Sequence, residues 1–269
     1  MTTSTITRHA ERPVGVLLRR WREQRRLTQL ELSIQADIST RHLSFVETGR
    51  SQPSRELLLH LAEELDLPLR ERNHLLLAGG FAPAYAETRL DAEPMSAVLA
   101  AVRKVLTGHE PYPAVVVDRA WNLVDANASA MAILTEGIAP ELLAPPANVL
   151  RVSLHPDGLA PRIANLGEWR AHLLGRLRRQ VAITADPGLE ALLEELRGYP
   201  CDQPEPEVEL PGPGDFLLWL RLRHRGGELA FFSTVATFGT PLDVTVAELA
   251  IESFFPADQA TAAALQRGA

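Results

Sequence analysis

The amino-acid sequence predicts an α+β protein with an all-α domain of five helices at its amino end and, after it, a domain that combines helices with an antiparallel sheet. Apolar residues recur at helical spacing in five short segments between residues 13 and 80. β-rich runs follow in two later regions, near residues 112–125 and after residue 216. The composition, 46% hydrophobic and 23% charged over 269 residues, is that of ordinary packed domains and excludes wholesale disorder and fibrous repeats.

The first three predicted helices have the pattern of a helix-turn-helix. Residues 14–25 form an amphipathic helix with a basic outer face. Thr28 and Glu31 have the spacing of a capping box, so a second helix begins there. Ser39 is a good N-cap for a third helix that ends near Glu47. Two short helices separated by a few turn residues are the arrangement in which the second helix enters the DNA major groove.

Two further helices complete the first domain. Ser54 begins a fourth helix and Pro68 a fifth, so short connections join five helices into one small domain. Proline and few large apolar side chains characterise the segment that follows, which predicts a linker. We therefore place a first domain at residues 1–80, the linker at residues 81–94 and a second domain at residues 95–269.

The net charge of −7 is distributed unevenly between these parts. Residues 1–60 carry ten arginines against six acidic residues, a balance of +4, whereas residues 61–269 carry 17 basic and 28 acidic residues, a balance of −11. A short basic region on an acidic body is typical of a nucleic-acid-binding module joined to another domain. The alternative is a basic surface that is merely solvated.

The second domain begins with a helix and a β-hairpin. Apolar spacing predicts a helix over residues 91–106, and residues 115–117 and 121–125 have the pattern of two paired strands. Asn127 begins a short helix, and residues 148–198 are largely helical in pattern. The helix around residue 170 has a basic outer face, which we interpret as solvated rather than as nucleic-acid-binding: Arg170, Arg176, Arg178 and Arg179.

The last third of the chain changes to a strand pattern. Residues 216–224, 229–238 and 244–254 are three β-rich runs in hairpin order. Two strands, several helices and three more strands predict a five-stranded antiparallel sheet with helices on one face. Such an architecture encloses a pocket between helices and sheet.

Motifs of catalysis are absent from the sequence. It contains no phosphate-binding Gly-Lys-Ser/Thr loop, no GxSxG, no HExxH and no CxxC, and its eight histidines lack the spacing of metal ligands. The single cysteine, Cys201, cannot form an internal disulfide. No apolar run approaches the roughly 20 residues of a membrane span, and the amino end lacks a signal-peptide core. We predict a cytoplasmic protein that is not an enzyme and has no metal, cofactor or membrane partner.

Candidate DNA contacts follow from the helix-turn-helix pattern. The outward positions of the third helix are Thr40, Arg41, Ser44 and Phe45. Arg41 can grip guanine through two hydrogen bonds, and Phe45 can meet a thymine methyl group. Gln29 is expected to contact a phosphate beside the amino end of the second helix. Arg50 is a candidate phosphate contact, with a simple exposed cation as the alternative.

The same residues carry a family resemblance. Leu27-Thr28-Gln29, Ile38-Ser39-Thr40, Val46-Glu47-Thr48-Gly49-Arg50 and Pro53-Ser54 resemble the phage-repressor (XRE, Cro/C1-type) helix-turn-helix family over the first quarter of the chain. The resemblance implies a structural ion pair between Arg22 and Glu47. Asp37 departs from the family, which usually has glycine in the turn. Because Asp tolerates left-handed backbone angles better than most residues, we expect the turn to survive.

A second resemblance covers nearly the whole chain. Residues 39–50, His155-Pro156-Asp157-Gly158-Leu159, Phe232-Ser233-Thr234 and residues 237–243 resemble the MmyB-like transcription regulators. This resemblance implies a helix-turn-helix joined to a ligand-binding domain of PAS-like shape, and a fatty acid is one ligand it suggests. The predicted order of strands and helices matches a PAS-like topology independently.

Candidate ligand contacts are apolar residues with a few polar anchors. The apolar candidates are Tyr112, Trp121, Leu154, Trp169, Phe231 and Phe238. His155 is a further candidate, although Pro-Asp-Gly after it is also strong turn chemistry. Arg162 could hold a carboxylate near the pocket mouth. For each of these residues the alternative is an ordinary place in the core or on the surface.

Together these patterns predict a sequence-specific DNA-binding transcription regulator that acts as a homodimer on a double-stranded operator. Its second domain is expected to sense a small apolar or acyl-type effector, such as a fatty acid. Dimerisation is expected because one short recognition helix reads few base pairs. In the alternative, the second domain is a dimerisation or protein-interaction module with a filled core and no ligand.

Overall fold

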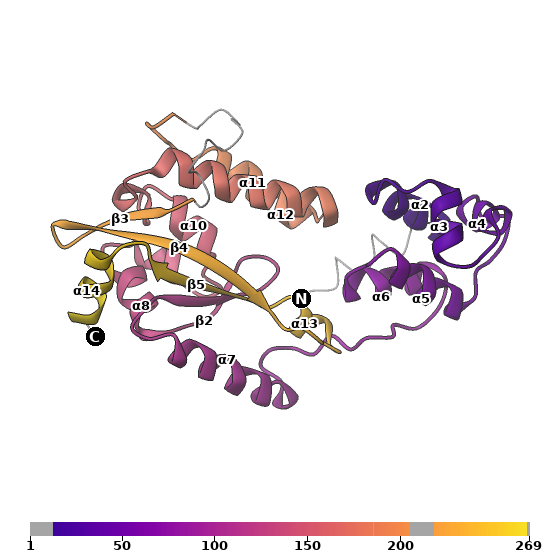
Figure 1. Ribbon diagram of the computed structural model, residues 1–269, viewed down its shortest axis with the longest axis horizontal. Helices are drawn as coiled ribbons and strands as arrows, with labels where there is room; N and C mark the ends of the chain where they lie inside the picture. Colours follow the sequence, from indigo (N-terminus) through magenta and orange to yellow (C-terminus); the bar gives the residue numbers. More distant parts are fainter. Residues whose placement is uncertain (1–12, 185, 205–217, 268–269) are drawn as a thin grey trace. The chain divides into compact units, whose positions relative to one another are not determined.

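The computed structural model describes residues 13–184, 186–204 and 218–267, and within it the chain divides into two compact units (Figure 1). The first, which we call the helical unit, comprises Met1–Leu90 together with Thr240–Ala247. The second, the sheet unit, comprises Asp91–Gly239 and Glu248–Ala269. The predicted linker, residues 81–94, spans the division between Leu90 and Asp91, and the boundaries of the predicted domains stay predictions.

The helical segments predicted between residues 13 and 80 are all formed: α2 (Val14–Gln24), α3 (Gln29–Gln35), α4 (Thr40–Glu47), α5 (Arg55–Glu64) and α6 (Leu69–Ala78). Thr28 and Glu31 form the predicted capping box, and the Ser39 and Ser54 side chains cap α4 and α5. Asp37 adopts a φ of 49° in the turn before α4, as its tolerance of left-handed angles predicts.

Leucine side chains from all these helices build the core of the helical unit. Leu18, Leu32, Leu43, Leu58 and Leu76 are among its fully buried members. Helices α2 and α4 approach so closely at Gly15 that a Cβ there would collide with the backbone carbonyl oxygens of Val46 and Glu47. Only glycine fits at that crossing, so the backbone of α2 directly sets the position of the last turn of α4.

An antiparallel sheet in the order β2-β1-β5-β4-β3 forms the centre of the sheet unit. Its strands are β1 (Ala114–Val117), β2 (Leu123–Ala126), β3 (Leu220–His224), β4 (Gly227–Thr237) and β5 (Ala250–Pro256). The pairing of β4 with β5 is continuous from Phe231 opposite Pro256 to Thr237 opposite Ala250. With the helices around it, this sheet confirms the predicted α+β class and the five-stranded antiparallel sheet within the described residues.

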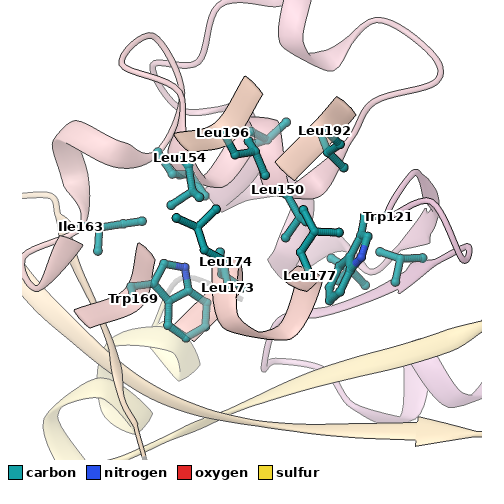
Figure 2. Packing of buried hydrophobic residues seen from close by; sticks show 14 of the residues in the cluster. Trp121, Leu150, Leu154, Ile163, Trp169, Leu173, Leu174, Leu177, Leu192 and Leu196 are labelled. Atoms are coloured by element: carbon teal, nitrogen blue, oxygen red, sulfur yellow. The ribbon is translucent and has the colours of Figure 1, made fainter. Parts of the chain in front are cut away.

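Helices and short 3-10 turns surround this sheet: η1 (Glu93–Met95), α7 (Ser96–Gly108), α8 (Ala128–Thr135), α9 (Pro140–Leu143), α10 (Val149–Leu154), η2 (Ala160–Arg162), α11 (Leu166–Thr184), α12 (Pro187–Arg197) and α14 (Gln259–Arg267). Apolar side chains of α10, α11 and α12 meet in one buried cluster (Figure 2). Leu150, Leu154, Leu177 and Leu196 are almost completely buried there. This cluster is the main core of the unit.

Several predicted boundaries after residue 90 were wrong. The strand expected over residues 244–254 begins only at Ala250, because Val244–Ala247 forms a helical turn, α13. The helix expected from residue 91 begins at Ser96, after η1. Trp121 lies in the hairpin turn with a φ of 66° rather than in a strand. The beginning of the run predicted at residue 216 lies outside the described residues, and α14 was not predicted.

Candidate DNA-binding face and ligand pocket

The exposed side of α4 carries the predicted base contacts. Leu43 and Val46 are completely buried, whereas Arg41 is exposed and Ser44 and Phe45 are half-buried on the opposite side. The Ser39 side chain accepts a hydrogen bond from the His42 amide, which fixes the start of this helix. The exposed side of α4 can therefore reach a ligand without disturbing the core.

Two arginines flank the aromatic ring on this face. The guanidinium carbon of Arg41 lies 5.3 Å from the centre of the Phe45 ring, and that of Arg50 lies 5.9 Å from it. Cation–π contacts of this kind orient long basic side chains without using their hydrogen-bond donors. Both arginines are exposed, and the face combines positive charge with an apolar centre. We call Thr40, Arg41, Ser44, Phe45 and Arg50 the candidate DNA-binding face.

The Thr40 side chain has a second role. Its hydroxyl oxygen lies 2.8 Å from the hydroxyl of Ser33, which is buried in α3. This bond ties the start of α4 to α3. Because a hydroxyl has one donor and two acceptor positions, Thr40 keeps capacity for a further contact.

A buried ionic network holds the helices of this unit in register. The implied pair is present: Arg22 Nε and Nη2 donate to the two carboxylate oxygens of Glu47 at 2.7 and 3.0 Å. The hydrogen bond to Glu47 raises the pKa of Arg22 above its ordinary value. Arg22 Nη1 also donates to the backbone oxygen of Leu27 at 2.8 Å. The end of α4 is thereby bound to α2.

Gln29 belongs to this network. Its Nε2 donates to Glu47 Oε2 at 2.7 Å. Gln29 was expected to contact a phosphate, and its amide group keeps one N–H and its oxygen for that purpose. The contact to Glu47 fixes the side chain at the first residue of α3, so Gln29 also positions α3 relative to α4.

In the sheet unit, the predicted aromatic and leucine contacts mostly lie in the core (Figure 2). Trp121, Leu154 and Trp169 belong to the main buried cluster. The indole N–H groups of the two tryptophans donate to Gln180 at 2.8 Å and to Ser153 at 3.0 Å. Their polar atoms therefore already have protein partners, which favours packing over ligand contact for these three residues.

The other predicted contacts are dispersed. Phe231 is buried and packs edge-on against Phe254, with ring centres 6.3 Å apart. Tyr112 is half-buried and lies edge-on to His109, and Phe238 is half-buried just after the end of β4. Among the described residues, Phe231 and Tyr112 therefore have aromatic packing partners of their own.

His155 and Arg162 both have local structural partners. The His155 Nδ1 accepts a hydrogen bond from the Asp157 amide at 3.0 Å, which is the turn chemistry that the sequence offered as an alternative. Arg162 Nη1 donates to the backbone oxygens of Ile133 and Glu136 at 3.1 and 2.7 Å, and its Nη2 lies 3.1 Å from the Glu136 carboxylate. Arg162 thus satisfies carbonyl groups at the carboxyl end of α8.

Beside Arg162 lies a pocket that the sequence did not predict. It has a volume of about 240 Å³ and lies between α8, the hairpin of β3 and β4, and α14. Its apolar lining residues are Pro111, Ala132, Ile133, Leu229, Ala264 and Leu265, and its polar lining residues are Ser129, Glu136, His224 and Arg225. His224 Nδ1 is 2.8 Å from the Glu136 carboxylate, which Arg162 also contacts. Arg162 therefore contacts one of the residues that line this pocket, which we call the hairpin pocket.

A buried polar cluster around Arg176 was also not predicted from the sequence. Arg176 was expected on a solvated face, but its side chain is only 22% exposed. Its guanidinium carbon lies 4.7 Å from the centre of the Trp121 ring, and its Nη1 is 3.3 Å from Glu252 Oε1 on β5. The hydroxyl of Ser233 on β4 donates to the same carboxylate at 2.9 Å. Burial, followed by the charge of Arg176, lowers the pKa of the neighbouring His172.

The described residues hold neither a metal-binding cluster nor a membrane-spanning helix. No cluster of three or more His, Cys, Asp or Glu side chains there is arranged to hold a metal ion. Within the same residues, none of the helices combines the length and apolar character that a membrane crossing requires.

Comparisons with known proteins assign both parts of the chain. Residues 13–75 match a family model described as a helix-turn-helix domain, and residues 98–267 match one described as MmyB-like transcription regulator ligand binding domain. Among curated proteins there is no match. A solved structure titled "Structure of an RNA-binding Light-Oxygen-Voltage Receptor" is similar at 12% identity over 99% of this chain and 63% of that chain, with a TM-score of 0.27. The chain thus spans less than two thirds of that protein, and the likeness is too low to support any inference.

Proposed function

Since the chain belongs to the MmyB-like transcription regulators, which join a helix-turn-helix domain to a ligand-binding domain, we propose that it binds a specific DNA operator as a homodimer and that a small apolar or acyl-type effector controls this binding. The observation that carries the DNA part is the candidate DNA-binding face of α4, which is built on a buried ionic network and points away from the core. Recognition helices of this class present such a face to the major groove.

The chemistry of this face supports base recognition. A guanidinium group can donate two hydrogen bonds to O6 and N7 of guanine, so Arg41 is the principal candidate for sequence specificity. The Phe45 ring offers apolar contact to a thymine methyl group, and Ser44 offers a hydroxyl. Arg50 follows the helix and suits a phosphate contact, which contributes affinity without sequence preference.

The homodimer is proposed from the size of the recognition element. Helix α4 has eight residues and reads only a few base pairs. A two-fold protein on a two-fold operator doubles the number of base contacts and fixes the spacing of the half-sites. We therefore expect a palindromic operator.

The hairpin pocket is our proposed effector site. Its lining of alanine, isoleucine, leucine and proline suits an apolar chain, and the exposed Arg225 suits a polar or anionic end group, whereas His224 is paired with Glu136. An effector changes operator affinity only if it prefers one arrangement of the protein, and DNA then changes effector affinity by the same factor.

The DNA proposal is tested with operators selected from random double-stranded DNA and with fluorescence anisotropy. Arg41→Ala should weaken operator binding about tenfold or more and relax specificity at one base position in each half-site. Arg50→Ala should weaken binding to all sequences by a similar factor. It should also reduce the slope of the logarithm of the binding constant against the logarithm of the salt concentration by about one. Arg178→Ala, which removes an exposed arginine of α11, is the matched control. Equal affinities for Arg41→Ala and Arg178→Ala would refute the role of α4.

Native mass spectrometry of the freshly purified protein tests both the homodimer and the effector. We expect a dimer with additional mass of fatty-acid size that is released on denaturation. Ala132→Phe, which fills the hairpin pocket, should lose this mass, whereas Met131→Phe, at an exposed neighbour on α8 outside the pocket, should keep it. A dimer without additional mass in the unmodified protein would favour an interaction module over an effector sensor.

A further inference from the structure

The helical unit includes a segment that connects two strands of the sheet unit. Thr240–Ala247, which connects β4 to β5, belongs to the helical unit, whereas both strands belong to the sheet unit. Thr237 at the end of β4 pairs with Ala250 at the start of β5, so the two strands are hydrogen-bonded up to the point where this connection begins. We call Thr240–Ala247 the strand connection.

Specific hydrogen bonds hold the strand connection in the helical unit. Asp243 and Ala86 form a parallel β-bridge, in which the Val244 amide donates to the Ala86 oxygen at 2.8 Å. The Thr88 amide donates to Asp243 Oδ2 at 3.0 Å. The other carboxylate oxygen, Oδ1, accepts from the Thr245 amide at 2.8 Å and caps α13. One carboxylate therefore both shapes the connection and binds it to residues 86–88.

Packing reinforces these bonds. The Val244 side chain is only 1% exposed, and α13 lies against α6. The segment that receives the connection is itself fixed to α6 by the buried Asn73. Asn73 Oδ1 accepts hydrogen bonds from the amides of Ala84 and Tyr85 at 2.9 and 3.1 Å, and Asn73 Nδ2 donates to the backbone oxygen of Tyr85 at 2.8 Å. Displacement of the strand connection would therefore disturb α6, one of the core helices of the helical unit.

At its other end, β4 reaches the hairpin pocket, and β5 connects to it through the helix that follows. β4 begins in the hairpin that lines this pocket, and Leu229 contributes to the lining. β5 leads into α14, whose Ala264 and Leu265 also line the pocket. With 11 residues at about 3.4 Å each, β4 spans about 35 Å. Figure 1 shows it as a long strand that runs the length of the sheet.

We propose that β4, β5 and the strand connection transmit effector occupancy from the hairpin pocket to the helical unit. This inference rests on the proposed function, since it requires both DNA and effector binding. A ladder of backbone hydrogen bonds resists stretching, so a shift of the hairpin is carried along β4 rather than absorbed within it. The coupling is reciprocal, so DNA bound to the helical unit changes effector affinity by the same factor, and in this proposal it does so through β4 and β5.

Reciprocity allows a test that needs no identified effector. The full chain is measured by hydrogen exchange with mass spectrometry, with and without the double-stranded DNA that the unmodified protein selects. We expect DNA to change the exchange rates of amides in residues 230–237 and 250–256 by about fivefold, the lower end of ordinary coupling. In Asp243→Ala this response should fall below about twofold while DNA is still bound, because α4 is untouched.

Two further variants make the result specific. Asp258→Ala removes the cap of α14, where Asp258 Oδ1 accepts from the Thr261 amide at 2.7 Å, but leaves the strand connection intact. It should retain the full response of β4 and β5. Asp243→Asn keeps an oxygen to cap α13 but loses one of its two acceptors, so it should show the reduced response without a loss of folding.

The possible outcomes distinguish DNA binding from transmission through β4 and β5. DNA binding without any change in β4 and β5 in the unmodified protein would overturn the inference and leave the DNA-binding proposal standing. A full response in both Asp243 variants would also overturn it. If the unmodified protein selected no DNA at all, the proposed function would fail, and this inference would fail with it.

Discussion

Replacement of Glu47 by alanine should destabilise the helical unit more than most single substitutions. The Glu47 side chain is 1% exposed and accepts three charge-assisted or amide hydrogen bonds, from Arg22 Nε, Arg22 Nη2 and Gln29 Nε2. Arg22 is only 9% exposed, so Glu47→Ala leaves a buried positive charge whose remaining partners are the Leu27 backbone oxygen and the Glu23 carboxylate, 3.9 Å from its Nη2. Loss of one partner from a buried ion pair costs about 3–5 kcal/mol.

The size of this loss can be compared with that of an exposed ion pair on α2, the helix that carries Arg22. Arg19 and Glu23 also form an ion pair, with a 2.7 Å contact, but their side chains are 64% and 53% exposed. Solvent screens such a pair, so Glu23→Ala should cost less than about 1 kcal/mol. Against a typical domain stability of about 5–15 kcal/mol, only the Glu47 substitution removes a large share.

Native-state hydrogen exchange across a urea series measures this difference directly. The amides of α2, α3 and α4 report the unfolding free energy of the helical unit, and those of β1 and β5 report the sheet unit as an internal reference. Glu47→Ala should lower the first free energy by about 4 kcal/mol. A loss below about 1 kcal/mol, equal to that of Glu23→Ala, would refute the reasoning that the buried network holds α4 in place.

Three further predictions follow from local geometry. Gly15→Ala should destabilise the helical unit by more than about 2 kcal/mol in urea unfolding, because the new Cβ would strike the backbone of α4. As a control, Gly108→Ala should change the unfolding free energy by less than about 1 kcal/mol, because its Cβ would meet nothing within 4 Å. Burial, with the charge of Arg176, lowers the pKa of His172 below its ordinary 6.5. The contribution of this histidine to the unfolding free energy is therefore complete above pH 6.5 and is lost as the pH falls below it. In His172→Phe, the unfolding free energy should depend less on pH between about pH 5 and 8, and an unchanged dependence would contradict this. Burial raises the pKa of Tyr199 to about 12, so the last tyrosine step in an absorbance titration should lie there and disappear in Tyr199→Phe.

The helical unit could be predicted from sequence because its signals are local. The capping box of Thr28 and Glu31 and the Ser39 cap each involve residues three positions apart, and the structure places the helices where those residues predict them. The outward side of α4 follows from helical periodicity once Leu43 and Val46 are assigned to the core. The Arg22–Glu47 pair came from a family resemblance, since its partners are 25 positions apart.

The hairpin pocket could not be predicted in this way. Its lining comes from α8, the hairpin of β3 and β4, and α14, and these elements meet only through the tertiary fold. Arg176 was misplaced for a related reason: a charged residue on a helix is usually solvated, and nothing nearby in sequence indicates its contact with Glu252 of β5. Val244–Ala247 has β-branched residues typical of a strand, but the Asp243 cap favours a helical turn there.

The strand connection limits how the two parts of this protein can be exchanged in evolution. A single crossover in the gene after residue 90 would combine the amino-terminal helices of one parent with the strand connection of another. The Ala86 oxygen and the Thr88 amide would then face an unrelated segment, and the site that buries Val244 would receive a side chain selected for a different surface. Residues 84–88 and 240–247 therefore form one unit of inheritance, and viable recombinants in this family should carry both from the same parent.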